Sequence, residues 1–451
     1  MVGAVELPIQ HTDIAGRLVH VIEPNPSGGA DWVTTYTYDV LGNLTNVSMP
    51  RPSGTQSRSL LQPRRPARHQ PRISYQYDGA HHVTKRTDAK GQETRYSYDS
   101  YARLTQVQHW ANVQVCEYRI GCWYELQEQT RQRVSYSYDA NPLNPAFSQN
   151  ATGRLAAVQF QEPLFGLPYS YQYSYNSAGR VTAQHTSYNS DQLAFDATYS
   201  WDDEGRATNL NYAGGWSGTN YKPIQHYVNS FDANGRLSGM TEAVDAGTPT
   251  SVAGASYGIA GEILSMSYFG VGESRTYNNL LQLTRIQATG MDMQYLYPAG
   301  ANNGRISQTI DGILNETATY SYDSVNRLSG VTATGAPTGP WNQTYTYDGF
   351  GNLTSKSAVG AYPATSTTYD PATNRPNVGS FDANGNAADG SMVWDIENRM
   401  IVGQAGEAYA YDPNGKRIYR RTGNPQQGPT AQEFYFPDVY GRGDGSKFTV
   451  K

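Results

Sequence analysis

The residues of this chain that could carry out acid or base chemistry are its aspartates. Asp202 and Asp203 are adjacent, and Asp382, Asp389 and Asp395 lie close together in the sequence. General acid and base catalysis needs two carboxylates in different environments within one pocket. Most of the aspartates instead recur at one position of a short repeated motif, which favours a role in capping turns. We therefore predict no catalytic residue and no enzymatic activity.

No group of residues has the spacing of a metal or cofactor site. The eight histidines are scattered, and His81 and His82 have no further ligand at metal-binding spacing. Segments at Asp232 and Asp382 resemble the start of a calcium loop, but both lack the later carboxylates and the terminal Glu. No phosphate-binding, dinucleotide-binding or hydrolase motif is present. We predict neither a metal nor a cofactor.

Cys116 and Cys122 are the only cysteines of the chain. Their flanks predict two strands around a short loop, so a disulfide across a hairpin is one interpretation. Two free thiols are the interpretation that we favour. The spacing matches no zinc pattern, and a single disulfide could not hold together a chain of this size.

The elements that position all these residues are set by the motif Tyr-x-Tyr-Asp, which the chain contains seven times. Repetition at this level determines the fold before any other feature does. We assign the motif residues a structural role in the repeat. They are Tyr36, Tyr38 and Asp39; Tyr75, Tyr77 and Asp78; Tyr96, Tyr98 and Asp99; Tyr136, Tyr138 and Asp139; Tyr320, Tyr322 and Asp323; Tyr345, Tyr347 and Asp348; and Tyr409, Tyr411 and Asp412.

Each copy of the motif predicts a β-hairpin. The copies continue with turn formers, then Gly or Asn, a polar residue and an aliphatic one, as in YTYDVLGNL from Tyr36 and YSYDSVNRL from Tyr320. The two tyrosines lie on one face of a strand because side chains alternate with period two. The Asp can accept a hydrogen bond from the backbone N–H two residues on, and the Gly or Asn tolerates a positive φ, so the chain reverses. The second strand then begins at Arg-Leu or Asn-Leu.

The fold class that follows is all-β, a repeat array of antiparallel β-hairpins that forms a curved or spiral sheet. A lone hairpin is marginally stable and must bury its aromatic face against neighbouring hairpins. We expect strands above roughly 40% of residues and helix below about 10%. The long gaps from Tyr36 to Tyr75 and from Tyr96 to Tyr136 are interpreted as two units with one copy degraded. The best helix candidates are residues 193–197 and 124–132, and the second also alternates like a strand.

The composition suits a thin, Tyr-rich sheet and excludes several functions. Only 38% of the 451 residues are hydrophobic, and the chain has 45 Gly and 36 Tyr. Tyr rings can stack while their hydroxyls keep a hydrogen-bond partner. The net charge of −5 argues against a nucleic-acid partner. No apolar run is long enough for a membrane span, and the N-terminus does not read as a Sec signal peptide.

We divide the chain into four parts. Residues 1–56 begin the array, and because Gly16, Arg17 and Leu18 read as the second half of a unit, we expect the chain to be a fragment. Residues 57–72 are rich in Arg and Pro and are interpreted as an insertion or a reading-frame error over one repeat; a basic docking loop is the alternative. Residues 73–435 form the main array, and residues 436–451 are expected to form a polar tail.

On these motifs the chain resembles the Rhs/YD-repeat family over most of its length. The resemblance implies a large β-shell in which a spiral of hairpins surrounds a hollow interior, as in bacterial Rhs toxins, the C component of insecticidal toxin complexes and the YD shell of teneurins. The bacterial family usually ends its shell with an Asp-Pro-x-Gly-Leu type motif, where the toxin is cut free. Here Asp412, Pro413, Asn414 and Gly415 are followed by Lys416 instead of Leu. We interpret this segment as the turn of an ordinary repeat.

The function that the resemblance implies is that of a noncatalytic shell scaffold, a fragment of a secreted or cell-surface protein. Its partner would be a polypeptide, either an enclosed C-terminal toxin or the remaining shell segments, and export would use a specialised secretion system. The alternative is a carbohydrate-binding or adhesion surface whose Tyr and Trp rings stack on a cell-surface glycan. The Arg-Gly-Asp tripeptide from Arg442 is an adhesion-like sequence of the kind that arises often by chance.

Overall fold

The computed structural model describes residues 9–23, 31–49, 72–118, 121–189, 193–212, 215–217, 220–222, 224–360, 362–370, 373–422, 431–435 and 447–450. Strands contain 56% of the residues. Within the described ranges the only helix is the short 3-10 turn η1 (Thr130–Gln132), and none is long and apolar enough to cross a membrane. The all-β prediction is therefore confirmed.

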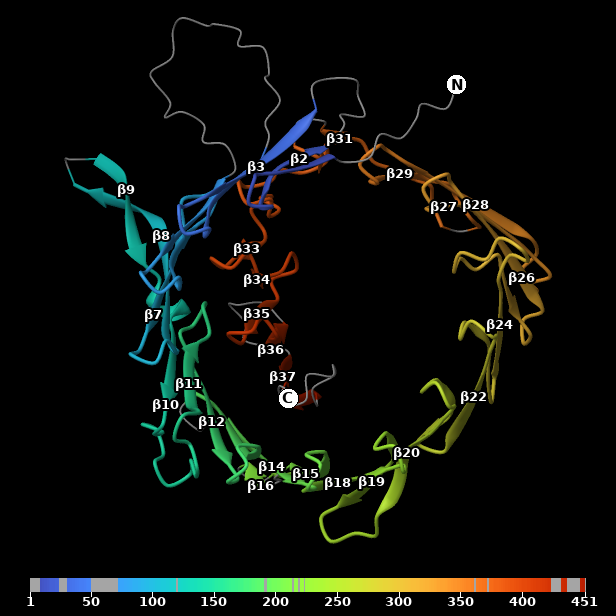
Figure 1. Cartoon of the computed structure of the whole chain (residues 1–451), viewed down its shortest axis with the longest axis horizontal. Coiled ribbons are helices and arrows are strands. Elements are labelled where there is room, and N and C mark those ends of the chain that lie inside the picture. The colour runs from blue at the N-terminus through green and yellow to red at the C-terminus, as the bar shows by residue number, and fades with distance from the viewer. Residues whose placement is uncertain are drawn as a thin grey trace, which may run out of the picture. The chain divides into compact units, whose positions relative to one another are not determined.

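The strands follow one another along the chain as short hairpins (Figure 1). The first group is β1 (Ile9–Thr12), β2 (Leu18–Glu23), β3 (Trp32–Tyr38), β4 (Leu44–Ser48), β5 (Arg72–Tyr77), β6 (Val83–Thr87), β7 (Glu93–Tyr98), β8 (Leu104–Glu117), β9 (Gly121–Glu128), β10 (Val134–Tyr138), β11 (Leu155–Gln161), β12 (Pro168–Tyr175) and β13 (Val181–Tyr188). The second group is β14 (Leu193–Trp201), β15 (Ala207–Tyr212), β16 (Gly215–Ser217), β17 (Asn220–Lys222), β18 (Gln225–Phe231), β19 (Leu237–Val244), β20 (Thr250–Tyr257), β21 (Ile263–Tyr268), β22 (Val271–Tyr277), β23 (Leu283–Ala288), β24 (Met291–Leu296), β25 (Gln308–Asp311), β26 (Glu316–Tyr322), β27 (Leu328–Thr334), β28 (Trp341–Tyr347), β29 (Leu353–Lys356) and β30 (Thr365–Ser366). The last group is β31 (Tyr369–Asp370), β32 (Arg375–Pro376), β33 (Val393–Trp394), β34 (Met400–Val402), β35 (Ala408–Tyr411), β36 (Arg417–Thr422), β37 (Ala431–Tyr435) and β38 (Lys447–Val450).

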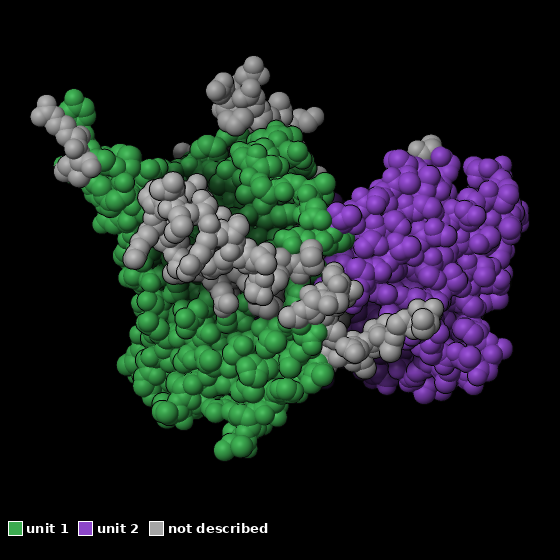
Figure 2. Space-filling model, turned by 90° about the horizontal axis from the view of Figure 1, so that it is seen from above, with its two compact units in different colours: residues 1–179, 184–194, 369–451 green, residues 180–183, 195–368 purple. Residues whose placement is uncertain are grey.

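Twenty-eight of these strands form one antiparallel sheet, and β33–β38 form a separate six-stranded sheet. Two small two-stranded sheets, β16–β17 and β31–β32, complete the described strands. The chain divides into two compact units, shown in Figure 2. Unit 1 comprises Met1–Gly179, Gln184–Ala194 and Tyr369–Lys451, and unit 2 comprises Arg180–Ala183 and Phe195–Thr368.

Each Tyr-x-Tyr-Asp motif ends a strand and starts a hairpin, as the sequence predicts. In unit 2, β26 pairs with β27, and Tyr320 lies opposite Val331. The register then shifts by one residue beside Tyr322, and the same bulge recurs before the turn of the other intact hairpins. Asn326 has a φ of 71° in this turn, which is the left-handed conformation expected at the Gly or Asn position. The repeated sequence thus produces a repeated turn geometry.

One long gap between motifs has a different cause from the one expected. Between Tyr96 and Tyr136, no degraded unit is present. Instead, β8 is 14 residues long, and its second half pairs with β9 over Ala111–Glu117, while β10 returns to pair with the first half of β8. The insertion is therefore a two-stranded ribbon that extends beyond the neighbouring strands (Figure 1).

A disulfide joins Cys116 and Cys122 at the far end of this ribbon, so our preference for free thiols was wrong. The two residues are direct partners across β8 and β9, and their Cα atoms are 4.1 Å apart. This separation lies close to the range that a disulfide spans. Six residues of sequence separation are enough to place two cysteines opposite each other when the loop between them is a tight hairpin.

Three further segments that the sequence analysis singled out can be compared with the structure. Residues 193–197 belong to β14, and residues 124–132 are divided between the end of β9 and η1, so neither segment is an α-helix. Residues 447–450, within the expected polar tail, form β38, which pairs with β37. The Arg/Pro-rich segment 57–72 lies outside the described residues except for Arg72, which begins β5, and the Arg-Gly-Asp tripeptide lies outside them entirely.

The sheet has a Tyr face and a hydroxyl face, because its strands alternate. In β26 and β28 the motif tyrosines are half-buried, whereas the residues between them, Ser321 and Thr346, are exposed. On the exposed face Thr346 bonds to Thr354 and Ser355 across the hairpin at 2.8 Å and 2.6 Å. The Tyr face therefore provides the apolar packing surface, and the opposite face is lined with hydroxyls.

In unit 1 the Tyr face packs on the six-stranded sheet, and the main core lies between the two layers (Figure 1). The buried residues of this core are Val107, Val134, Val158, Phe160, Tyr169 and Tyr171 from the long sheet, and Ala410, Ile418 and Tyr419 from β35 and β36. Unit 2 has a smaller core of Ala318, Val331 and Ala333, against which Tyr320 and Tyr345 pack. Its aromatic rings therefore remain largely half-buried.

Candidate functional site: the repeat turns and an aromatic cavity

The motif aspartates hold the turns by a fixed set of hydrogen bonds. Asp323 Oδ1 accepts from the backbone N–H of Val325 at 3.0 Å, as the turn chemistry predicts, and from that of Arg327 at 2.8 Å. Its Oδ2 accepts from Arg327 Nε at 2.6 Å. Burial opposes ionisation of Asp323, but the bonds from Arg327 lower its pKa. The Arg four residues after the Asp is thus part of the turn, and the sequence analysis missed this role.

Where it is present, the same Arg also links its hairpin to the next one. The Arg327 guanidinium lies 4.7 Å from the ring centroid of Tyr347 and donates to the carbonyl of Asp348 at 3.0 Å. In return, the Tyr347 hydroxyl donates to the carbonyl of Leu328 at 2.9 Å. Equivalent hydroxyl bonds to the preceding hairpin are donated by Tyr38, Tyr77, Tyr98, Tyr175, Tyr257, Tyr277, Tyr297, Tyr322 and Tyr411. This contact explains why Tyr, Asp, Arg and Leu recur together.

The seven copies of the motif lie at equivalent places in the structure. Their tyrosines form the ends of β3, β5, β7, β10, β26, β28 and β35, and each Asp follows its strand. Asp139 is the exception: it has a φ of 67° and accepts hydrogen bonds from Gly153 and from Arg103 of the preceding hairpin. The Arg103 bond lowers the pKa of Asp139 to about 2.

The carboxylates and histidines considered for chemistry are not gathered into one site. Asp202, Asp382 and Asp395 each hold their own turn, Asp389 binds Ser391, and Asp203 is exposed. His82 bonds to Asp78 at 2.9 Å, while His81 bonds to Asn43. Among the described residues, no three His, Cys, Asp or Glu side chains come close enough to hold a metal ion.

A partly buried ionic cluster that no sequence motif indicates joins the two layers of unit 1. Glu397 lies at the tip of the turn between β33 and β34 and inserts against the long sheet. Its carboxylate accepts from Arg86 at 2.9 Å and from the Thr94 hydroxyl at 3.0 Å, and it lies 2.9 Å from Nε2 of His109. Burial opposes its ionisation, but His109 and Arg86 lower the pKa of Glu397 to about 2. The sequence carries no signal for this cluster because the partners are about 300 residues apart in the chain.

Beside this cluster lies a cavity of about 390 Å³ in unit 1. Its walls come from β7, β8, β10 and β11 and from the turns that precede β34 and β36. The lining is mainly aromatic and aliphatic, and the polar groups that reach it include Glu397, Arg399 and Asp412. A concave, largely apolar cavity with a few convergent polar groups is the usual form of a small-ligand site.

Asp412 is the unusual residue of this cavity. It holds an ordinary repeat turn, as expected, because its Oδ1 accepts from the N–H groups of Asn414 at 2.9 Å and Lys416 at 2.8 Å. However, only 2% of its surface is exposed. Burial raises the pKa of Asp412, whereas the pKa of the equivalent Asp323 is lowered. A carboxyl group with a raised pKa in a cavity is a candidate functional group.

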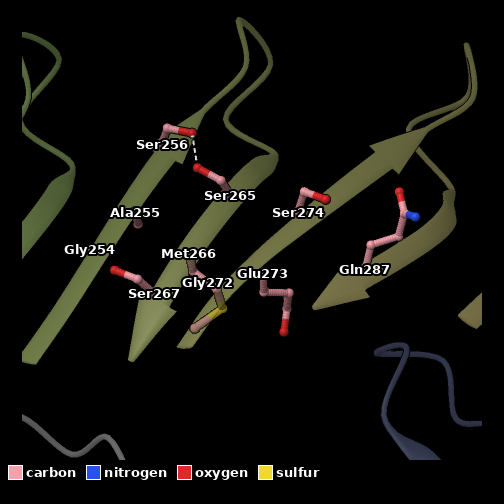
Figure 3. Close-up of a pocket in the computed structure, with 10 residues that line it drawn as sticks. All are labelled: Gly254, Ala255, Ser256, Ser265, Met266, Ser267, Gly272, Glu273, Ser274 and Gln287. Atoms are coloured by element: carbon pink, nitrogen blue, oxygen red, sulfur yellow. Dashed lines mark hydrogen bonds between the residues drawn. The ribbon is translucent and has the colours of Figure 1, made fainter. Parts of the chain in front are cut away.

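A second, shallower groove of about 540 Å³ lies on β20–β23 of unit 2 (Figure 3). Its lining is made of small and hydroxyl-bearing residues, and Ser256 and Ser265 bond to each other across it at 2.6 Å. Glu273 and Gln287 are its larger polar residues. The rings of Tyr268, at the end of β21, and Phe269 are 62% and 61% exposed and meet edge to face, but strand alternation places the Tyr268 ring on the sheet face opposite Ser265 and Ser267.

Comparisons with known proteins agree with this geometry. The family model of the RHS repeat matches residues 74–113, which span β5 to β8. The crystal structure of TcdB2-TccC3 aligns with 95% of this chain and 24% of its own at a TM-score of 0.65 and 15% identity. The structure of the Photorhabdus luminescens Tc holotoxin pore aligns with 96% of this chain and 22% of its own at a TM-score of 0.59 and 15% identity. No curated protein matches the sequence.

At this low identity the structural likeness shows the fold alone, and the chain spans about a quarter of the length of the structures it matches. The repeated hairpins, the matched RHS repeat and the shared fold agree with one another. They confirm the resemblance that the Tyr-x-Tyr-Asp motif indicated. The chain therefore contains an RHS repeat at residues 74–113 and has the fold of an Rhs shell.

Proposed function

We propose that this chain is a noncatalytic segment of a secreted or cell-surface Rhs shell that encloses or presents another polypeptide. In this role the aromatic face of the hairpins contacts the enclosed chain, and the hydroxyl face is directed away from it. The enclosed polypeptide is a toxin or another effector. The names of the similar structures, which are complexes of a Tc toxin, support this proposal.

The observation that carries the proposal is that the Tyr face in unit 1 already packs on polypeptide. Tyr96 and Tyr136 contact the core that β35 and β36 complete, and Glu397 binds to the same face. In unit 2 the equivalent rings of Tyr320 and Tyr345 are only half-buried. A half-buried row of tyrosines provides apolar area together with hydroxyl donors, which suits contact with a polypeptide of varied sequence.

A protection experiment tests this function. An unfolded, protease-sensitive polypeptide is fused after Lys451, and its rate of cleavage is compared with that of the same polypeptide fused to an unrelated β-repeat protein. We expect the Rhs-repeat chain to slow the cleavage of the fused polypeptide and to lose this protection in denaturant. Equal cleavage rates in the two fusions would contradict the proposal.

The groove on β20–β23 favours carbohydrate binding as a second candidate function. Its serine hydroxyls and the Gln287 amide can exchange hydrogen bonds with a sugar. Screening the purified chain on a glycan array tests this function. Specific binding that is lost in a Gln287→Ala variant would support it, and an array without specific signals would exclude it for the glycans presented.

A further inference from the structure

Asp412 differs from the other repeat aspartates in the bonding of one oxygen. In ten equivalent turns, Oδ2 accepts a hydrogen bond from the side chain four residues on, whereas Oδ2 of Asp88 accepts from Asn384 and that of Asp139 from Arg103. The donors are Arg17, Arg103, Arg206, Arg236, Arg327 and Arg399 in six turns, and Asn43, His82, Asn352 and Asn386 in four others. At Asp412 the fourth residue is Lys416, and only its backbone N–H binds, to Oδ1. Within the described residues, Oδ2 of Asp412 has no hydrogen-bond partner.

Asp412, whose Oδ2 is meant here, lines the aromatic cavity of unit 1. The rings of Tyr96, Tyr136, Phe160 and Tyr411 also line the cavity. The nearly buried Asp412 carboxylate is held through Oδ1 alone, so a donor that binds Oδ2 would replace hydrogen bonds to water that burial has removed. The exposed residues Asn414 and Gly415 form part of the lining, so the cavity can be reached from solvent.

The other charged groups that face the cavity already have partners. Glu397 is held by Arg86 and His109, and Arg399 Nε donates to Asp395 at 2.7 Å. After these pairs are formed, the charge that remains in the cavity is that of the Asp412 carboxylate. The cavity therefore favours a cation that can donate N–H groups.

We propose that this cavity binds the guanidinium group of an arginine side chain supplied by the polypeptide that the shell encloses, an inference that rests on the proposed function. The repeat itself shows the chemistry. In six turns the same oxygen accepts from an arginine whose guanidinium carbon lies 4.6 to 5.3 Å from an aromatic ring centroid. At Asp412 both the acceptor and the aromatic rings are present, and the arginine is missing from the chain. A partner's arginine would fill this place by a charge-assisted hydrogen bond and a cation–π contact.

The proposal is tested with two capped tripeptides, acetyl-Gly-Arg-Gly-amide and the same peptide with citrulline, which keeps the shape of arginine but has no charge. Ligand-observed NMR titrations of the whole chain measure their binding. We expect the arginine peptide to bind at least about tenfold more tightly than the citrulline peptide and its lysine counterpart. We expect Asp412→Asn to remove this preference, because the amide presents no charge to the guanidinium.

Two further variants make the test specific. Lys416→Arg restores the ordinary turn, and the guanidinium of the new arginine should then donate to Oδ2 of Asp412. We expect this variant to fold normally and to bind the arginine peptide at least about tenfold more weakly than the wild-type chain. Asp323→Asn alters the same repeat position in unit 2, where Arg327 already fills Oδ2, and should leave peptide binding unchanged.

Equal binding of the charged and neutral peptides, tighter binding of the lysine peptide, or unchanged binding in Lys416→Arg would overturn the proposal. If Asp412→Asn fails to fold, the Lys416→Arg result decides the question. A loss of arginine selectivity with intact protection of a fused polypeptide would reject this site and leave the proposed function standing. A loss of protection with intact selectivity for the arginine peptide would reject the proposed function and leave the guanidinium site standing.

Discussion

Replacing Glu397 by Gln should destabilise unit 1 by an amount that the structure allows us to work out. The change keeps the size of the side chain but removes the charge that Arg86, Thr94 and His109 surround. The pKa of Glu397 falls from 4.5 to about 2 in the folded chain. One pKa unit corresponds to about 1.4 kcal/mol, so ionisation of this group contributes about 3 kcal/mol to folding at pH 7.

The expected pH dependence follows from the direction of this shift. Because the folded-state pKa of Glu397 is lowered, its contribution is complete above the unfolded value near 4.5 and is lost as the pH falls towards 2. The difference between the wild-type chain and Glu397→Gln should therefore be about 3 kcal/mol at pH 7 and roughly half of that at pH 3. Urea unfolding monitored by circular dichroism at the two pH values measures it.

The chain offers a matched control for this experiment. Glu204 occupies the same position of its own turn, two residues after Asp202, and pairs with Arg206 at 3.1 Å, but its side chain is 66% exposed. Exposed ion pairs contribute little, so Glu204→Gln should change stability by less than about 0.5 kcal/mol. Our reasoning about the partly buried cluster would be refuted if Glu397→Gln behaved like Glu204→Gln, or if its effect did not shrink in acid.

The other predictions concern the repeat and the ribbon. Tyr347→Phe should cost about 1 kcal/mol because it loses the bond to the preceding hairpin, and Tyr347→Ala about 3 kcal/mol, whereas Ala at Tyr101, which is 78% exposed, should be nearly silent in urea melts. A silent Tyr347→Ala would mean that the ring does not pack. Asp323→Ala should cost about 1 kcal/mol in the same assay by losing the turn bonds, and a neutral result would contradict their role. Serine in place of both Cys116 and Cys122 should speed proteolysis of the ribbon while leaving global unfolding within about 0.5 kcal/mol, and a larger global loss would show that the ribbon supports the core.

The features that could be predicted from the sequence are those that depend on near neighbours. Tyr-x-Tyr fixes which residues share a face, and Asp323 with Asn326 fixes the turn, so both the hairpin and the all-β class follow from local chemistry. The Arg327 contact with Tyr347 reaches only the next hairpin. It could have been found from the regular spacing of the Asp and the Arg four residues later.

The features that could not be predicted depend on contacts between distant parts of the chain. A Glu at the tip of a repeat turn looks the same in sequence whether its side chain is 66% exposed, as that of Glu204 is, or 27% exposed, as that of Glu397 is. The difference arises only when β33 and β34 meet strands that lie about 300 residues earlier. The burial of Asp412 has the same origin. The disulfide was misjudged because we reasoned from chain size and zinc spacing and did not consider the direct pairing of two strands.

The bonds between successive hairpins also bear on how such a chain can change its length over evolution. Where the turn carries an Arg, as at Arg327, the hairpin offers a guanidinium to the following one and receives a hydroxyl from it, so the link is made to an immediate neighbour. Gain or loss of a whole hairpin leaves each remaining link with an equivalent partner. Gain or loss of a single residue within a strand would instead reverse the faces beyond it and bring a tyrosine opposite a hydroxyl row. Duplication and deletion of complete hairpins are thus the changes that the structure tolerates. The sheet can become longer or shorter in evolution without changing the hydrogen bonds between successive hairpins.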